Sequence, residues 1–140
     1  MGNNSSIQKI NCEDMQKICI ETDKYILINT LEANMQNCLI KNTVNIHEEE
    51  SLINMLLNTS INKSIIIYGI NCNDDKIFKK YEQLIKLGFT NVYIYVGGMF
   101  EWLLLQDIYG DELFPTTSKV RDILKYKSKK ILDIKYITNY

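Results

Sequence analysis

Apolar positions along the chain fall into two kinds of pattern that follow one another. Compact apolar runs, typical of buried strands, occupy residues 24–29, 64–68 and 91–96, with a weaker run at 43–46. Apolar residues at helical spacing predict helices over residues 12–20, 48–58, 77–88 and 99–106. Strand and helix therefore alternate through most of the chain, which is typical of an α/β domain with right-handed crossovers.

The run at 64–68 holds three consecutive isoleucines and has no polar face. A strand that is apolar on both faces lies in the middle of a parallel sheet covered by helices. In such sheets the ligand site lies where the carboxyl ends of the strands lead into helices. We therefore expect a central, mainly parallel sheet flanked by helices, with residues 69–75 as the first candidate site.

Composition and charge limit the classes of protein to which this chain can belong. The 140 residues suit one domain, and 46% apolar with 24% charged residues suit a folded globular chain. A net charge of −1 argues against nucleic-acid binding, and no apolar stretch is long enough to predict a membrane span. The single histidine, His47, is expected to be solvated near a helix start.

The cysteines do not predict a disulfide framework or a metal site. Four are present, without a Cys-x-x-Cys pair: Cys12, Cys19, Cys38 and Cys72. The first three lie on or beside apolar segments and are expected to be buried thiols. Since the sequence also has no secretory signal pattern, we expect a cytoplasmic protein with reduced thiols, no metal and no cofactor.

The order of segments from about residue 12 to 106 resembles the rhodanese-like (sulfurtransferase) family. The most specific part is IIIYG, a loop, and YEQLIKLGFTNVYIYVGGMFEW, where the matching residues are Gly88, Phe89, Asn91, Val92, Gly97, Gly98 and Trp102. In the earlier segment Ile40, Asn45 and Ile46 match, whereas Asn29, Leu31, Leu39, Lys41 and Asn42 do not. The resemblance implies a three-layer α/β fold with a flexible leader (1–11), a rhodanese-like domain (12–118) and a basic carboxyl-terminal extension (119–140).

The loop departs from the family pattern at the reacting position. The resemblance places a nucleophilic cysteine directly after the central strand, where this sequence has Gly69. Asp74 and Asp75 stand at the start of the next helix, where their carboxylates would take the amide donors that otherwise hold an anion. The loop that corresponds to the active-site loop comprises Gly69, Ile70, Asn71, Cys72, Asn73, Asp74 and Asp75. We expect a catalytically inactive domain that acts as an interaction or regulatory module.

Cys72 supplies the alternative hypothesis. In a longer loop the nucleophile could stand three residues further along, so that Cys72 receives the sulfane sulfur in an active sulfurtransferase. Such a cysteine needs positive partners or free amides that stabilise its thiolate. Asp74 and Asp75 work against a thiolate, which favours a bystander role for Cys72.

The amino terminus, MGNNSS, fits the pattern for N-myristoylation of Gly2, with Ser6 at the sixth position. The alternative is a chance match in a polar leader. A single myristoyl chain binds a membrane only marginally, so the pattern predicts reversible association with a membrane surface.

The carboxyl-terminal part offers two interpretations. The aromatic residues Phe100, Trp102, Tyr109 and Phe114 are expected to pack in the core, and the alternative is a surface that docks a protein partner. The lysine-rich extension is expected to form a solvated face, a short helix and an edge strand at 131–137. Contact with an acidic partner or with lipid headgroups is its alternative role.

Overall fold

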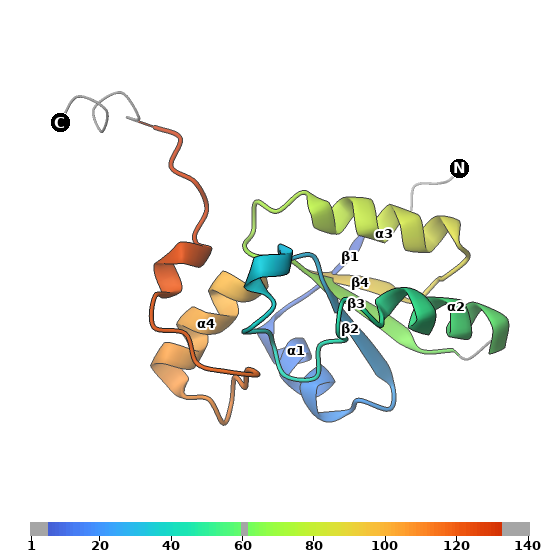
Figure 1. Ribbon diagram of the computed structural model, residues 1–140, viewed down its shortest axis with the longest axis horizontal. Helices are drawn as coiled ribbons and strands as arrows, with labels where there is room; N and C mark the ends of the chain where they lie inside the picture. Colours follow the sequence, from blue (N-terminus) through green and yellow to red (C-terminus); the bar gives the residue numbers. More distant parts are fainter. Residues whose placement is uncertain (1–5, 60–61, 133–140) are drawn as a thin grey trace.

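The fold is built on a four-stranded parallel sheet, seen in the computed structural model, which describes residues 6–59 and 62–132. The strands are β1 (Gln8–Ile10), β2 (Tyr25–Asn29), β3 (Ser64–Tyr68) and β4 (Val92–Tyr95). Their order in space is β1-β4-β3-β2, so β3 lies between two neighbours, as its apolar sequence predicts (Figure 1).

Four helices complete three layers. They are α1 (Cys12–Ile20), α2 (Glu49–Thr59), α3 (Lys76–Lys86) and α4 (Gly98–Tyr109), with short 3-10 helices η1 (Ala33–Met35) and η2 (Ile123–Tyr126). α2 and α3 cover one face of the sheet, and α1 and α4 cover the other. The expected α/β architecture with a parallel central sheet is confirmed.

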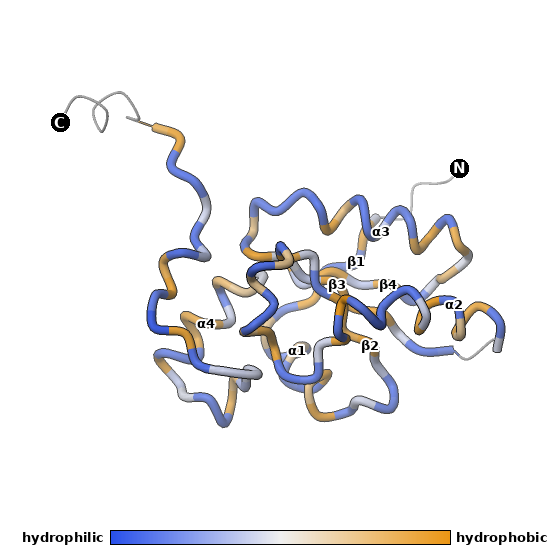
Figure 2. Tube along the Cα trace, viewed as in Figure 1, coloured by the Kyte–Doolittle hydropathy of each residue, from blue (hydrophilic) through white to orange (hydrophobic). Residues whose placement is uncertain are grey.

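The side chains of β3 point alternately into two separate cores. Ile65 and Ile67 pack with α2 and α3, whereas Ile66 and Tyr68 pack with α1 and α4. All four are fully buried. Figure 2 shows the same arrangement as apolar strands inside and a largely hydrophilic outer side of α3. The absence of a polar position in this strand is therefore explained by burial on both faces.

Trp102 lies at the centre of the second core. It is fully buried, and its ring packs edge-on against Tyr95 and Phe114, with centroids 6.2 and 5.0 Å away. The indole Nε1 donates a hydrogen bond of 3.0 Å to the Pro115 carbonyl. The expectation that the aromatic residues pack in the core is confirmed for Trp102 and Phe114 and is wrong for Tyr109, which is 60% exposed in the last turn of α4.

Two predicted boundaries are wrong. The leader was expected to be flexible through residue 11, but Gln8–Ile10 form β1, which pairs with β4, and Asn11 then caps α1. The strand expected at 43–46 is reduced to a single bridge between Thr43 and Leu27. In both places a contact distant in sequence decides the structure, rather than the local pattern.

The carboxyl-terminal extension is partly packed on the domain. Tyr126 in η2 is fully buried beside α4, with Val120 and Ile123 against the same core. After η2 the chain leaves the body of the domain (Figure 1). Residues 131–132 form no strand, and the rest of the expected strand at 131–137 lies outside the described residues. Within the described part of the chain, no helix is long and apolar enough to cross a membrane.

Candidate functional site

The loop between β3 and α3 is fixed at its base by the start of α4. The Gly69 and Ile70 carbonyls accept hydrogen bonds of 2.8 Å from the backbone N–H groups of Met99 and Phe100. Gly98 makes this approach possible because it has a φ of 69°, and a Cβ there would lie 2.7 Å from the Gly69 oxygen. The glycine pair after β4 thus forms a tight turn that holds the candidate loop in place.

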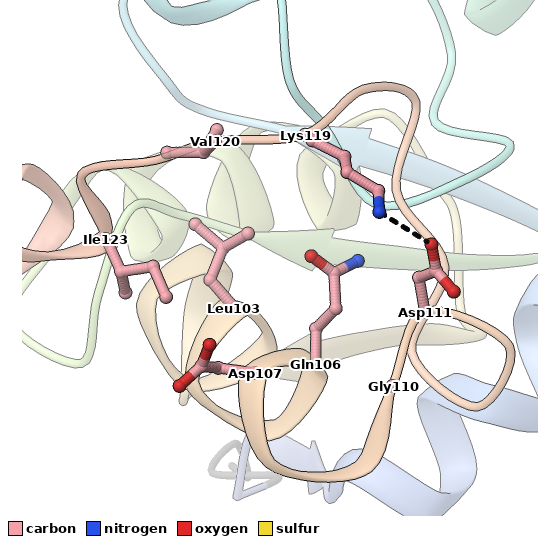
Figure 3. A pocket seen from close by; sticks show the side chains of 8 residues that line it. All are labelled: Leu103, Gln106, Asp107, Gly110, Asp111, Lys119, Val120 and Ile123. Carbon is pink, nitrogen blue, oxygen red and sulfur yellow. Dashed lines mark ion pairs between the residues drawn. The ribbon is translucent and has the colours of Figure 1, made fainter.

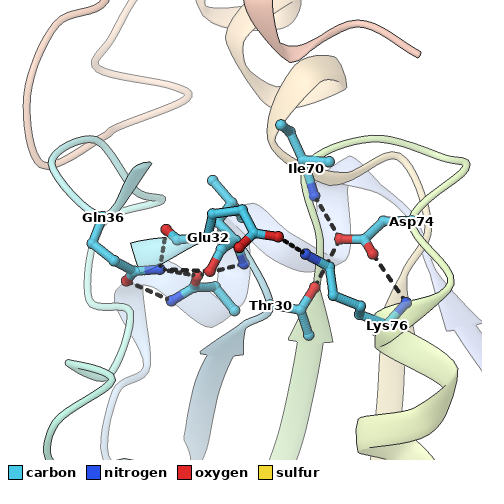
Figure 4. Close-up of polar contacts among 8 residues, drawn as sticks. Thr30, Glu32, Gln36, Ile70, Asp74 and Lys76 are labelled. Atoms are coloured by element: carbon cyan, nitrogen blue, oxygen red, sulfur yellow. Dashed lines mark hydrogen bonds and ion pairs between the residues drawn. The ribbon is translucent and has the colours of Figure 1, made fainter. Parts of the chain in front are cut away.

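The side chain of Asp74 occupies the interior of this loop. Its Oδ2 accepts hydrogen bonds from the Ile70 N–H at 3.2 Å and from the Thr30 hydroxyl at 2.9 Å. Its Oδ1 accepts a hydrogen bond from the Lys76 N–H at 3.0 Å (Figure 4). Asp74 is only 8% exposed. One carboxylate therefore holds amide donors on both sides of the loop.

Gly69 and Asp74 are packed against each other. A Cβ at position 69 would lie 2.3 Å from Asp74 Oδ2 and 2.8 Å from its Cβ. A real Cβ does not approach other atoms this closely, so any side chain at position 69 requires Asp74 to move. The position that the family resemblance gives to a nucleophile lies directly under the Asp74 carboxylate.

Asp75 differs from its neighbour. It stands at the amino-terminal cap of α3, but its side chain makes no capping hydrogen bond and is exposed. The expectation that both aspartates take loop amides is right for Asp74 and wrong for Asp75. The reason is the backbone, because Asp75 already has helical φ and ψ of −72° and −14°, which turn its side chain away from the amides.

The remaining loop residues join the loop to the extension. Asn71 Oδ1 accepts from the Asn73 N–H at 2.9 Å, and Asn71 Nδ2 donates to the Tyr126 carbonyl at 2.9 Å. Cys72 is exposed, and its Sγ lies 4.0 Å from the Ser128 hydroxyl. The extension, which the sequence pattern did not place here, therefore runs beside the loop.

The other three cysteines are placed differently. Cys19 and Cys38 are buried, and burial raises the pKa of Cys19 to about 11. Cys12 is half-buried, and its pKa is raised by burial, by Glu101 and by Glu13. Cys38 Sγ lies 3.2 Å from the Ser118 carbonyl. These are packed thiols, as expected.

Asn29 and Leu31, two of the positions that do not match the family pattern, are both uncharged. Asn29 is buried at the end of β2 and forms a reciprocal amide pair with Gln36, at 2.8 and 3.2 Å (Figure 4). Its Oδ1 also accepts from the Leu31 N–H at 3.0 Å. Leu31 is in the apolar core beside α1 and α4. Neither residue offers a charge to a substrate near the loop.

A groove between α2 and α3 opens beside the loop, with a volume of about 610 Å³. Thr30 and Lys76 line its end nearest the loop. Lys76 is paired with Glu32 at 2.8 Å, and Lys80 is paired with Glu49 at 2.5 Å. Two of the three lysines that line the groove are therefore paired with glutamates, and Lys79 is the third. In residues 6–59 and 62–132, no three His, Cys, Asp or Glu side chains are grouped as metal ligands would be.

Comparisons with known proteins agree on the fold. The sequence profile of the rhodanese-like domain matches residues 14–105. A yeast protein tyrosine phosphatase of the rhodanese family superposes with a TM-score of 0.59 at 10% identity, covering 86% of this chain and 99% of the other. A single-domain sulfurtransferase of Saccharomyces cerevisiae gives 0.52 at 17%, covering 81% and 100%. The As-Sb reductase of Leishmania major gives 0.54 at 19%, covering 76% and 81%. No curated protein matches the sequence.

Proposed function

Because the chain belongs to the rhodanese-like domain family, we propose that it is a member without the usual active-site cysteine. In this proposal it has lost sulfur transfer and serves as a small interaction or regulatory module. The observation that carries the proposal is the Asp74 carboxylate in the loop, packed on Gly69.

The chemistry of sulfur transfer supports this interpretation. A thiolate attacks the outer sulfur of thiosulfate, a sulfur–sulfur bond forms, and sulfite leaves with the electron pair of the broken bond. Both the thiolate and the persulfide need free amide donors. Here the Ile70 and Lys76 N–H groups already donate to Asp74, whose charge also repels a dianion such as thiosulfate. The Asp74 carboxylate thus occupies the amide donors that a bound anion would need.

A thiosulfate-to-cyanide assay tests the proposal. We expect turnover no higher than that of a heat-killed control. Turnover well above the control, abolished by Cys72→Ser, would contradict the inactive interpretation.

A gain-of-function series tests the role of Asp74. The variant Gly69→Cys introduces a thiol that shares the loop with a displaced Asp74 carboxylate, and Gly69→Cys combined with Asp74→Ala removes that carboxylate and frees the amides. We expect the double variant, treated with thiosulfate, to gain one sulfur atom at position 69 by intact mass, and the single variant to gain far less. Equal labelling of both variants would show that Asp74 does not block the cradle.

The second candidate function is sulfur transfer through Cys72 as the persulfide carrier. It is favoured by one observation, since Cys72 is the exposed cysteine and lies in the loop. Intact mass after sulfur-donor treatment distinguishes the two functions, because this candidate requires one added sulfur atom in the natural protein and none in Cys72→Ser.

Phosphoryl transfer, suggested by the likeness to the yeast phosphatase, has less support. The loop GINCNDDK contains no arginine, so it lacks the group that holds a transferring phosphoryl group in such a cradle. Assay of the natural protein with a phosphotyrosine peptide tests this directly, and we expect no phosphate release.

A protein partner and a lipid anchor complete the proposal. The partner would bind the loop face, or the aromatic and basic carboxyl-terminal part. Gly2, which lies outside the described residues, would carry a myristoyl group that holds a cytoplasmic protein reversibly at a membrane. Co-expression with an N-myristoyltransferase and a labelled fatty acid tests the modification. We expect label on the natural protein and none on Gly2→Ala.

A further inference from the structure

The outer side of α4 and the turn after it present apolar side chains to solvent. Leu104 and Ile108, one helical turn apart, are 40% and 69% exposed, and Tyr109 and Leu113 are 60% and 55% exposed. None of the described residues covers this group. An exposed apolar surface of this kind is typical of an interaction site. We call these four residues the α4 surface.

Exposed carboxylates alternate with the residues of the α4 surface along the chain. They belong to Asp107, Asp111 and Glu112. Asp107 lies in the last turn of α4, where the helix dipole disfavours a negative charge, and that turn holds no basic residue. In the described part of the chain, the salt bridge found at this rim joins Lys119 to Asp111 at 3.6 Å. The surface is therefore apolar in the middle and acidic at its edge.

A cavity of about 310 Å³ adjoins this rim, between α4 and the first part of the extension. Leu103, Val120 and Ile123 line it with apolar side chains, and Gln106, Asp107 and the Lys119–Asp111 ion pair supply polar and charged groups (Figure 3). The Asp107 carboxylate beside an apolar lining suits a second lysine, because the methylene stem packs on the apolar side chains while the ammonium reaches the carboxylate.

The chain itself carries a segment of the complementary kind. After η2, residues 127–132 (KSKKIL), which we call the arm, leave the body of the domain (Figure 1). Lys127, Lys129 and Lys130 are exposed, and the apolar pair Ile131 and Leu132 is 78% and 77% exposed. This pair is the hydrophobic stretch next to the carboxyl-terminal grey trace in Figure 2. A basic arm with an apolar pair is thus matched in chemistry to an apolar surface with an acidic rim.

The dimensions also match. Six extended residues span at most about 20 Å, and the twelve residues of α4 span about 18 Å. These six residues are therefore enough to lie along one α4 surface. Beyond η2 they leave the body of the domain that carries them (Figure 1), which favours the surface of another molecule over that of their own.

We propose that two copies of this chain exchange their arms, each arm lying on the α4 surface of the other copy. Lysines of the arm face the carboxylates of the rim, and Ile131 and Leu132 cover part of the α4 surface. Because the exchange is reciprocal, it closes as a two-fold dimer and leaves no free arm to extend a fibre. Ser128, at the start of the arm, lies beside Cys72, but the contact between the two copies uses no loop residue and does not depend on whether the loop is catalytic.

The dimer is expected to be weak and sensitive to salt. Two short arms make a small interface, so we expect a dissociation constant of about 10–100 μM in low-salt buffer. Added salt screens exposed charges beyond about 10 Å at 0.1 M and about 3 Å at 1 M, so the dimer should dissociate as salt rises.

Charge reversal in two places tests the proposal by sedimentation equilibrium. The arm variant is Lys129→Glu with Lys130→Glu, and the rim variant is Asp107→Lys with Glu112→Lys. Each alone places like charges in both contacts, so each should raise the dissociation constant by about tenfold or more. Mixed in equal amounts, the two variants restore opposite charges in both contacts. We expect the mixture to form heterodimers with nearly natural affinity.

A matched control reverses two exposed lysines on α3, with Lys79→Glu and Lys86→Glu, and should leave the dimer unchanged. Circular dichroism melts confirm that each variant is folded. Four results overturn the proposal: a natural protein that stays monomeric up to about 1 mM in low salt, a mixture that does not recover association, a control that weakens the dimer as much as the arm variant does, or a dimer whose dissociation constant is unchanged in about 1 M salt.

Discussion

Gly98 illustrates how one residue can determine the shape of the candidate site. Its φ of 69° is strained for any other residue, and the space for a Cβ is already taken by the Gly69 oxygen and the Asn71 nitrogen, at 2.7 and 3.0 Å. We expect Gly98→Ala to lower the free energy of unfolding by about 2–5 kcal/mol, since backbone strain and a steric clash add together. Urea denaturation measures the change.

Gly88 provides the control for that prediction. It also has a positive φ, 108°, but a Cβ there would meet no atom within 4 Å. Gly88→Ala therefore carries strain alone and should cost about 1–3 kcal/mol. An equal loss in the two variants would mean that the contact between Gly98 and the loop contributes nothing.

Tyr126 and Tyr68 are both fully buried, but only one hydroxyl is satisfied. The Tyr126 hydroxyl has no hydrogen-bond partner among the described residues, whereas the Tyr68 hydroxyl accepts from the Ile40 N–H at 3.1 Å and contacts the Thr43 hydroxyl at 2.7 Å. We expect Tyr126→Phe to stabilise the protein by about 1 kcal/mol and Tyr68→Phe to destabilise it by about 1–2 kcal/mol. Thermal melts of both variants decide this, and a loss of stability in Tyr126→Phe would reveal a partner for its hydroxyl.

Among the elements, α4 has two structural roles. Its first turn fixes the loop after β3, and its Trp102 fills the core on that face of the sheet. We expect Trp102→Ala to cost about 3–5 kcal/mol, the range for a large buried aromatic side chain. Trp102→Phe keeps most of the packing but leaves the Pro115 carbonyl without its donor, so it should cost clearly less. A cost under about 1 kcal/mol for the alanine variant, measured in denaturant, would mean that the ring is not part of the core.

The elements also separate what the sequence could predict from what it could not. β3 was predictable because Ile65, Ile66 and Ile67 leave no polar face, and that pattern has one common explanation. β1 was not, because Gln8 and Lys9 are polar, and only pairing with β4 makes the segment a strand. The predicted strand at 43–46 has a suitable local pattern but only a single bridge, to β2. Hydrophobic patterns in the sequence predict which strands are buried better than they predict which segments pair in the sheet.

The candidate site was predictable to a similar degree. The place of the loop follows from the strand order, and the role of Asp74 follows from its position before a helix. The contact between Asn71 and the Tyr126 carbonyl joins positions 55 residues apart and had no signal in the sequence. The apolar residues Val120, Ile123 and Tyr126, close together in a lysine-rich segment, were the hint in the sequence that the extension is anchored.

For the molecule as a whole, buried cysteine and tyrosine side chains with raised pKa values determine how the stability changes at high pH. Burial raises the pKa of Cys19 from 9.0 to about 11, and burial also raises the pKa values of Tyr68 and Tyr95, the latter helped by Glu101. These groups hold their protons more tightly when folded, so their contribution is complete below about pH 9 and is lost as the pH rises. Cys19 alone should account for about 1–2 kcal/mol of lost stability between pH 8 and pH 10.5.

Urea melts at a series of pH values test this expectation. The natural protein should have constant stability near pH 8 and a steady decline above pH 9. Cys19→Ala should decline less steeply, because it lacks one of the titrating groups. A natural protein whose stability is flat or rising up to pH 11 would contradict the sign of the effect.

The pairing of β1 with β4 also affects how the molecule is made. Gln8 pairs with Tyr93, so the first strand to leave the ribosome has no partner until 85 further residues have been added. At about 5–20 residues per second, that delay lasts about 4–17 s. During synthesis β2 and β3 can pair first, and the amino-terminal segment joins the sheet last. An enzyme that modifies nascent amino termini therefore has several seconds to act before β1 is in place.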